Sequence, residues 1–148
     1  MVDGLEKEIG TVDTVMGVFA VASEKLTAKN PDTLGFSQHD LYNGFRRLKS
    51  ETGDKALDYL DYRREGDAWC SKALHDLLFF SGWGGSIQET RVACRAGCKV
   101  YGPVARETIK KIENEYGSKT LAEITKMADL FLKYVEEGRS TENVRIPQ

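Results

Sequence analysis

The sequence predicts an all-α fold, a compact bundle of about five to seven helices with a long central helix. Small polar residues repeatedly precede amphipathic stretches, glycines follow them, and no convincing alternation of polar and apolar residues indicates a sheet. The predicted helix starts pair a capping side chain with a later carboxylate: Ser37 with Asp40, Ser86 with Glu89, and Thr120 with Glu123. The predicted helix ends are Gly53, Gly66, Gly82, Gly117 and Gly138.

The first helix is expected to begin at about residue 5 or 11 and to end at about residue 28. Its apolar residues recur at helical spacing: Val12, Val15, Met16, Phe19, Ala22 and Leu26. Pro31 lacks an amide hydrogen and biases Asn30 away from helical geometry, so a loop is expected next. A second helix follows Ser37, with Leu41, Phe45 and Leu48 on one side.

Two shorter helices are predicted in the middle of the chain. Asp54 and Asp67 each follow a glycine, and each can cap a helix. The first of these helices has an inner edge of Ala56, Leu57 and Leu60 that Tyr59 and Tyr62 widen, whereas the second is apolar over a wide arc. The residues of that arc are Trp69, Cys70, Ala73, Leu74, Leu77, Leu78 and Phe80. Residues 82–85 then form a flexible turn.

The longest predicted element is a helix from Ile87 to Tyr116, kinked near Pro103. On a wheel that turns about 100° per residue, its apolar residues keep one phase across the proline. A full break after Tyr101 is one alternative, because proline also suits the first turn of a helix. The other alternative is a hairpin near residues 88–101 that turns at Ala96 and Gly97, which would make the chain a winged-helix α+β protein.

A last helix is predicted to end before Gly138. Its inner face consists of Leu121, Ile124, Ala128, Phe131 and Val135. Residues 139–148 are predicted to be a polar C-terminal tail. The whole chain, residues 1–148, is thus expected to be a single helical domain.

Composition restricts the classes of function. Hydrophobic residues make up 41% of the 148 residues and charged residues 30%, with a formal net charge of −2. No apolar run approaches the roughly 20 residues that cross a bilayer, and the acidic start lacks the features of a secretory signal. We therefore expect no membrane contact, a cytoplasmic location, and no general attraction to nucleic acid.

The cysteines are weak candidates for metal binding or redox chemistry. Cys94 and Cys98 are four residues apart on one predicted helical face, and Cys70 lies on a neighbouring helix. Paired knuckles of the kind found in common zinc sites are missing from the sequence. We interpret the three residues as reduced, structural thiols and expect neither a metal nor a cofactor.

A basic strip is the first candidate for a binding surface. It consists of Arg91, Arg95, Lys99, Arg106 and Lys110, which follow one side of the predicted long helix. Several cations on one helix face could contact phosphates of a nucleic acid or an acidic partner. An ordinary solvated face is the competing interpretation, because acidic residues are interspersed with the basic ones.

An aromatic group is the second candidate. Trp69, Phe79, Phe80 and Trp83 concentrate beside the glycine-rich turn, and they could anchor an interface or a homodimer. Burial in the protein's own core is the competing interpretation.

No catalytic constellation is found. His39 and His75 each precede an aspartate, but adjacent residues on a helix diverge in direction. The leading hypothesis is a non-enzymatic interaction or regulatory subunit that binds another macromolecule, with a protein partner or self-association favoured. The alternative is nucleic-acid binding through the basic strip, and a third hypothesis is thiol-redox or metal-dependent chemistry at the cysteines.

Overall fold

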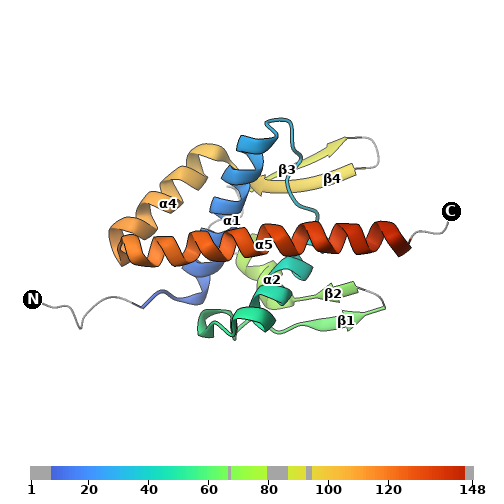
Figure 1. Cartoon of the computed structure of the whole chain (residues 1–148), viewed down its shortest axis with the longest axis horizontal. Coiled ribbons are helices and arrows are strands. Elements are labelled where there is room, and N and C mark those ends of the chain that lie inside the picture. Colours follow the sequence, from blue (N-terminus) through green and yellow to red (C-terminus); the bar gives the residue numbers. More distant parts are fainter. Residues whose placement is uncertain (1–7, 67, 80–86, 93–94, 146–148) are drawn as a thin grey trace, which may run out of the picture.

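The computed structural model describes residues 8–66, 68–79, 87–92 and 95–145 (Figure 1). This part of the chain is mostly helical, as the sequence predicts, with two small two-stranded sheets in addition. Its α-helices are α1 (Thr11–Lys29), α2 (Gln38–Thr52), α3 (Lys72–Phe79), α4 (Gly102–Tyr116) and α5 (Ser118–Arg145). Its other elements are a 3-10 helix η2 (Lys55–Leu57) and the strands β1 (Arg63–Glu65), β2 (Ala68–Cys70), β3 (Ile87–Val92) and β4 (Arg95–Val100).

The central helix is α1, not the helix predicted around Pro103. Residues 17–23 of α1 are all buried, and α4 and α5 pack directly against it. Helix α2 packs on α5. Four phenylalanine rings meet in the core, with Phe36 against both Phe19 and Phe131, and Phe131 against Phe45. None of the helices in the described ranges has both the length and the hydropathy needed to cross a membrane.

The prediction of a helix over residues 87–100 is wrong. These residues form an antiparallel hairpin, with register from Ile87↔Val100 to Val92↔Arg95, and the helix begins only at Gly102, with Pro103 in its first turn. The hairpin alternative is confirmed in its location, but the turn follows Val92 instead of lying at residues 96–97. The run is short and contains small residues, so its apolar positions suit a helix and a strand equally well.

The β3–β4 hairpin is attached to the loop between α1 and α2 by backbone hydrogen bonds. Phe36 N–H donates to Cys98 O, and Cys98 N–H donates to Phe36 O, both at 2.7 Å. The two backbones can approach because glycines occupy both sides of the contact. Gly35 has φ +91°, and a Cβ there would collide with the Cys98 carbonyl, while a Cβ at Gly97 would collide with the carbonyl of Leu34.

Several predicted helix ends are confirmed by the structure. Ser37 and Asp40 form the expected capping box, with hydrogen bonds of 3.0 and 2.9 Å. Gly53 ends α2 with φ +62°, Asp54 caps η2 instead of a longer helix, and Gly117 ends α4.

Other predicted helix ends are wrong. Helix α5 continues through Gly138 to Arg145, so much of the predicted polar tail is helical. A Cβ at Gly138 would meet the Asn43 amide, so this glycine permits close packing of α5 on α2. Thr120 lies inside α5 and Glu89 lies in β3. Ser86 and Gly82 are outside the described residues.

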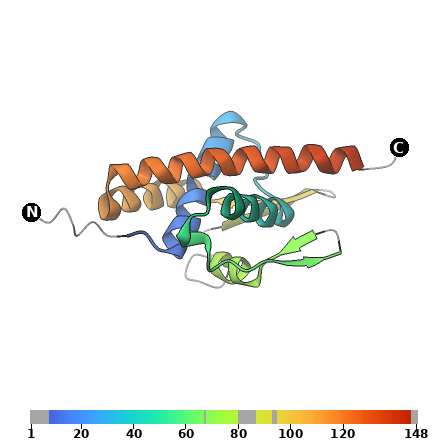
Figure 2. The same ribbon diagram turned by 60° about the horizontal axis from the view of Figure 1, so that its bottom comes forward.

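The β1–β2 hairpin replaces the beginning of the predicted fourth helix. Its register runs from Arg63↔Cys70 to Glu65↔Ala68, and the helix that follows starts only at Lys72. The Ser71 side chain accepts a hydrogen bond from Leu74 N–H and so caps α3. Both hairpins point toward the end of the molecule where α5 has its C-terminus (Figures 1 and 2).

Candidate functional site

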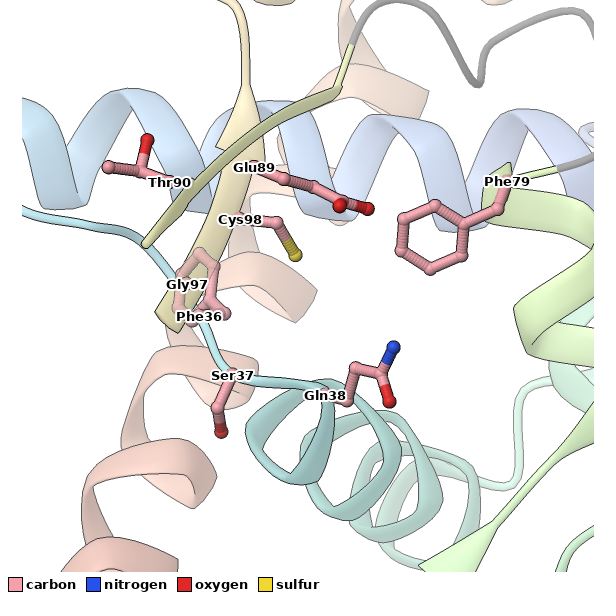
Figure 3. Close-up of a pocket in the computed structure, with 8 residues that line it drawn as sticks. All are labelled: Phe36, Ser37, Gln38, Phe79, Glu89, Thr90, Gly97 and Cys98. Atoms are coloured by element: carbon pink, nitrogen blue, oxygen red, sulfur yellow. The ribbon is translucent and has the colours of Figure 1, made fainter. Parts of the chain in front are cut away.

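A pocket of about 470 Å³ lies between the start of α2, the end of α3 and the β3–β4 hairpin (Figure 3). Its volume is in the range of small-molecule sites. The carboxylate of Glu89, the thiol of Cys98, the ring of Phe79 and the amide of Gln38 are directed toward one common space (Figure 3). The lining residues are Phe36, Ser37, Gln38, Phe79, Glu89, Thr90, Gly97 and Cys98.

The wall formed by Phe36 is rigid. Its backbone is paired with Cys98, and its ring packs edge-on against Phe19 and Phe131, with ring centroids 6.0 and 5.4 Å apart. The Ser37 hydroxyl accepts from Asp40 N–H in the capping box, so it is already engaged. The other polar side chains of the wall, Gln38, Glu89 and Thr90, are exposed to solvent.

The thiol of Cys98 is an unreactive part of the wall. Burial, reinforced by the negative charges of Glu89 and Asp40, raises the pKa of Cys98 to about 12. Because the nucleophile in thiol chemistry is the thiolate, this cysteine stays protonated and inert at neutral pH. The burial of Cys98 that the sequence predicts is therefore confirmed.

Cys70 and Cys98, the two cysteines that the structure describes, do not belong to a metal-binding group. Cys70 is half-buried on β2, and its thiol donates toward Glu65 at 3.8 Å, while Cys94 lies outside the described residues. Among the residues that the structure describes, no group of three or more His, Cys, Asp or Glu side chains could hold a metal ion.

The basic strip does not lie on one helix face, because its residues belong to three different elements, β3, β4 and α4. Arg91 and Arg95 lie in β3 and β4 next to the hairpin turn, and Lys99 in β4 donates to Thr33 O at 3.2 Å. Arg106 and Lys110 lie on α4, where Arg106 pairs with Glu24 at 3.2 Å. The strip was expected on the basis of a continuous helix, and the hairpin divides it.

The described members of the aromatic group lie in different surroundings. Phe79 lines the pocket, with its ring 5.1 Å from that of His75. Trp69 is half-buried on β2 beneath the guanidinium groups of Arg46 and Arg64, at 4.6 and 5.6 Å from its ring centre. Phe80 and Trp83 are outside the described residues.

The cluster around Trp69 consists of Arg46, Tyr62, Arg64 and Trp69. It could not be recognised from the sequence, because its members come from α2, from both strands of β1–β2 and from the residue before β1. Burial lowers the pKa of Arg46 and raises that of Tyr62. Arg46 Nε and the Tyr62 hydroxyl are buried without a hydrogen-bond partner in the described structure. Spacing along the chain gives no signal for this group, since only the packing of the hairpin on α2 assembles it.

Comparison with known proteins finds no matching protein family, no matching curated protein and no matching solved structure.

Proposed function

We propose that the chain is a non-enzymatic protein that binds double-stranded nucleic acid with the β3–β4 hairpin and α3, in the manner of a winged-helix protein. The order of its elements supports this: two helices separated by an extended segment, a third helix, and a hairpin. The extended segment at Phe36 pairs with β4, so the hairpin gains a short third strand. This backbone pairing is the observation on which the proposal rests.

One difference from a simple helix-turn-helix supports a variant of that design. Residues 53–71 separate α2 from α3, whereas helix-turn-helix proteins have a turn of only about 3–4 residues. The β1–β2 hairpin and η2 are thus an insertion between the two helices.

Arginines near the tip of the β3–β4 hairpin supply positive charge that can contact the phosphates of a nucleic acid. Arg91 and Arg95 lie within the last two register pairs before the turn, Arg91↔Ala96 and Val92↔Arg95. Lys72, whose side chain is 85% exposed, begins α3. Contacts to phosphates position a protein on a duplex, and arginine is the usual residue that enters a narrow minor groove. Since the net charge is −2, the attraction is local.

Fluorescence anisotropy with a labelled random-sequence duplex, measured over a series of salt concentrations, tests this proposal. Each lost phosphate contact reduces the slope of log affinity against log salt by about 0.9, so R91Q/R95Q is expected to reduce it by about two. The matched control is R106Q/K110Q on α4, which removes the same charge and should leave the slope unchanged. No binding by the wild type, or equal loss in both variants, would contradict the proposal.

Binding of a protein partner is the second candidate function, and the cluster around Trp69 favours it. Tryptophan and arginine are the residues most enriched at the energetic centres of interfaces. Affinity capture after nuclease treatment should retain a partner with the wild type and lose it with W69A. The control is Y59A, because Tyr59 is 67% exposed and lies outside the cluster. Retention of the same partner by W69A would show that the cluster around Trp69 is not the binding surface.

A further inference from the structure

We propose that the pocket between α2, α3 and the β3–β4 hairpin binds a small aromatic cation. The first argument is charge: among the lining residues that the structure describes, Glu89 supplies the single carboxylate, and none is Lys, Arg or His. Glu89 forms no ion pair or hydrogen bond with any other described residue, so its charge is uncompensated there. An anion would be repelled by this wall.

The neighbouring carboxylate of Asp40 is in a different state. It accepts from Arg139 Nη2 at 2.6 Å and from the Ser37 N–H at 2.9 Å, so its charge is already balanced. Glu89 is therefore the carboxylate at this wall that is left to attract a cation.

The second argument is the apolar part of the lining. Phe79 borders the pocket with a half-buried ring, Phe36 closes it from the core, and a cation over the face of the Phe79 ring gains electrostatic attraction from the ring quadrupole. Cys98 adds an uncharged thiol between them, and Gln38 adds an amide that can orient a polar group of the ligand (Figure 3). A flat ring system with a positive charge satisfies all of these groups.

The third argument excludes a bare metal ion as the occupant. One exposed carboxylate, one amide and a protonated thiol do not make the three- or four-ligand set that metal ions require. The pocket is also much larger than an ion, at about 470 Å³. An organic cation matches both the negative charge and the volume of the pocket.

The test compares two probes with the same ring system. N-methylacridinium carries a permanent positive charge, and acridine is uncharged at mildly alkaline pH. Titration of the full chain, followed by the fluorescence of each probe, should show that the cation binds about fivefold to tenfold more tightly than the neutral ring. E89Q should lower this preference to the part that the aromatic ring contributes, because it removes the carboxylate while keeping the size of the side chain.

The matched control is E107Q, which removes one exposed carboxylate from α4 and changes the net charge equally. It should keep the preference for the cation. In addition, F79L should weaken the binding of both probes, because it removes an aromatic wall while keeping an apolar side chain. Equal affinity of the wild type for both probes, or equal behaviour of E89Q and E107Q, overturns the proposal. The proposal does not depend on nucleic-acid binding, since both titrations are done with protein alone.

Discussion

The two hairpins have the same topology but are attached to the helical bundle in different ways. β3–β4 is joined to the α1–α2 loop by two backbone hydrogen bonds, and Ile87, Cys98 and Val100 are buried in the core. β1–β2 consists of three residue pairs, with β1 exposed and β2 half-buried. It packs on α2, where the guanidinium group of Arg46 lies 4.6 Å from the centre of the Trp69 ring.

This difference separates a hairpin that belongs to the core from one that lies on it. An isolated two-stranded hairpin is at best marginally stable in water, so each hairpin takes its stability from its attachment. We therefore expect β3–β4 to open only when the bundle unfolds, and β1–β2 to open by itself at much lower free energy.

The largest expected effect comes from adding a methyl group to a glycine beside each hairpin. G35A should lower the free energy of unfolding by about 3–4 kcal/mol, because it combines a positive φ with a collision against the Cys98 backbone. G66A, in the β1–β2 turn, has a positive φ but nothing within 4 Å, so it should cost only about 1 kcal/mol. Urea unfolding measures both values. Equal losses of unfolding free energy in G35A and G66A would contradict a tighter attachment of β3–β4 than of β1–β2.

The next effect concerns two arginines, each changed to glutamine. Arg139 reaches the buried carboxylate of Asp40, which is 6% exposed, and also donates to Gly35 O. R139Q should cost about 2 kcal/mol, because it leaves that carboxylate without its charged partner. R63Q removes an ion pair with Glu65 whose side chains are 77% and 60% exposed, and should cost under about 0.5 kcal/mol. Chemical denaturation at low salt measures the free energy of unfolding of both variants. A larger loss in R63Q than in R139Q would contradict this prediction.

Alkaline pH should destabilise the protein through Cys98. Burial keeps its thiol protonated in the folded chain up to a pH of about 12, whereas the unfolded chain loses the proton from about 9 upward. Stability should therefore fall by about 1.4 kcal/mol per pH unit in that window, and be unaffected below it. C98S should show a shallower slope, and C70S on the other hairpin should behave as the wild type.

A second group contributes to the same alkaline loss in every variant. The hydrogen bond from Tyr116 to Asp13, together with burial, raises the pKa of Tyr116 to about 12. Its effect cancels when C98S is compared with the wild type by thermal unfolding at each pH. Parallel curves for the two proteins would show that Cys98 does not cause the loss, and would attribute it to tyrosines with a raised pKa, such as Tyr62 and Tyr116.

The smallest expected effect is local. W69A should speed hydrogen exchange of the β1–β2 amides about tenfold while lowering global stability by only about 1 kcal/mol, since it removes the stacking with Arg46 but no core contact. Exchange in β3–β4 should not change. Mass spectrometry of exchanged peptides measures both hairpins in one experiment, and an equal increase in the two would contradict their independence.

Local signals predicted the parts of the fold that local chemistry determines. The capping box at Ser37, the glycine after α2 and the bounds of α1 all depend on neighbouring residues, and the structure confirms them. The structure of segment 87–100 does not depend on neighbouring residues alone. Its pairing with Phe36 requires two glycines 62 positions apart, Gly35 and Gly97, which allow the two backbones to approach closely.

Only some individual residues of the candidate site could be predicted from the sequence, not their arrangement. Phe79 and Cys98 were identified from the sequence, but as members of an aromatic group and a thiol group on helices. Glu89 was assigned to a helix cap, and its place in the pocket follows from the strand it occupies. Residues from three separate elements face one another only after the tertiary fold has formed, so spacing along the chain could not reveal the pocket.

The contact between Arg139 and Asp40 also bears on the order of events during synthesis. These residues are 99 positions apart, and Arg139 also contacts Gly35 in the loop that pairs with β4. While a ribosome translates the chain, α1 and α2 emerge early but lack the covering that α5 provides. Apolar faces of the first helices therefore stay open to chaperones until α5 has left the exit tunnel, and the cooperative unit closes only then.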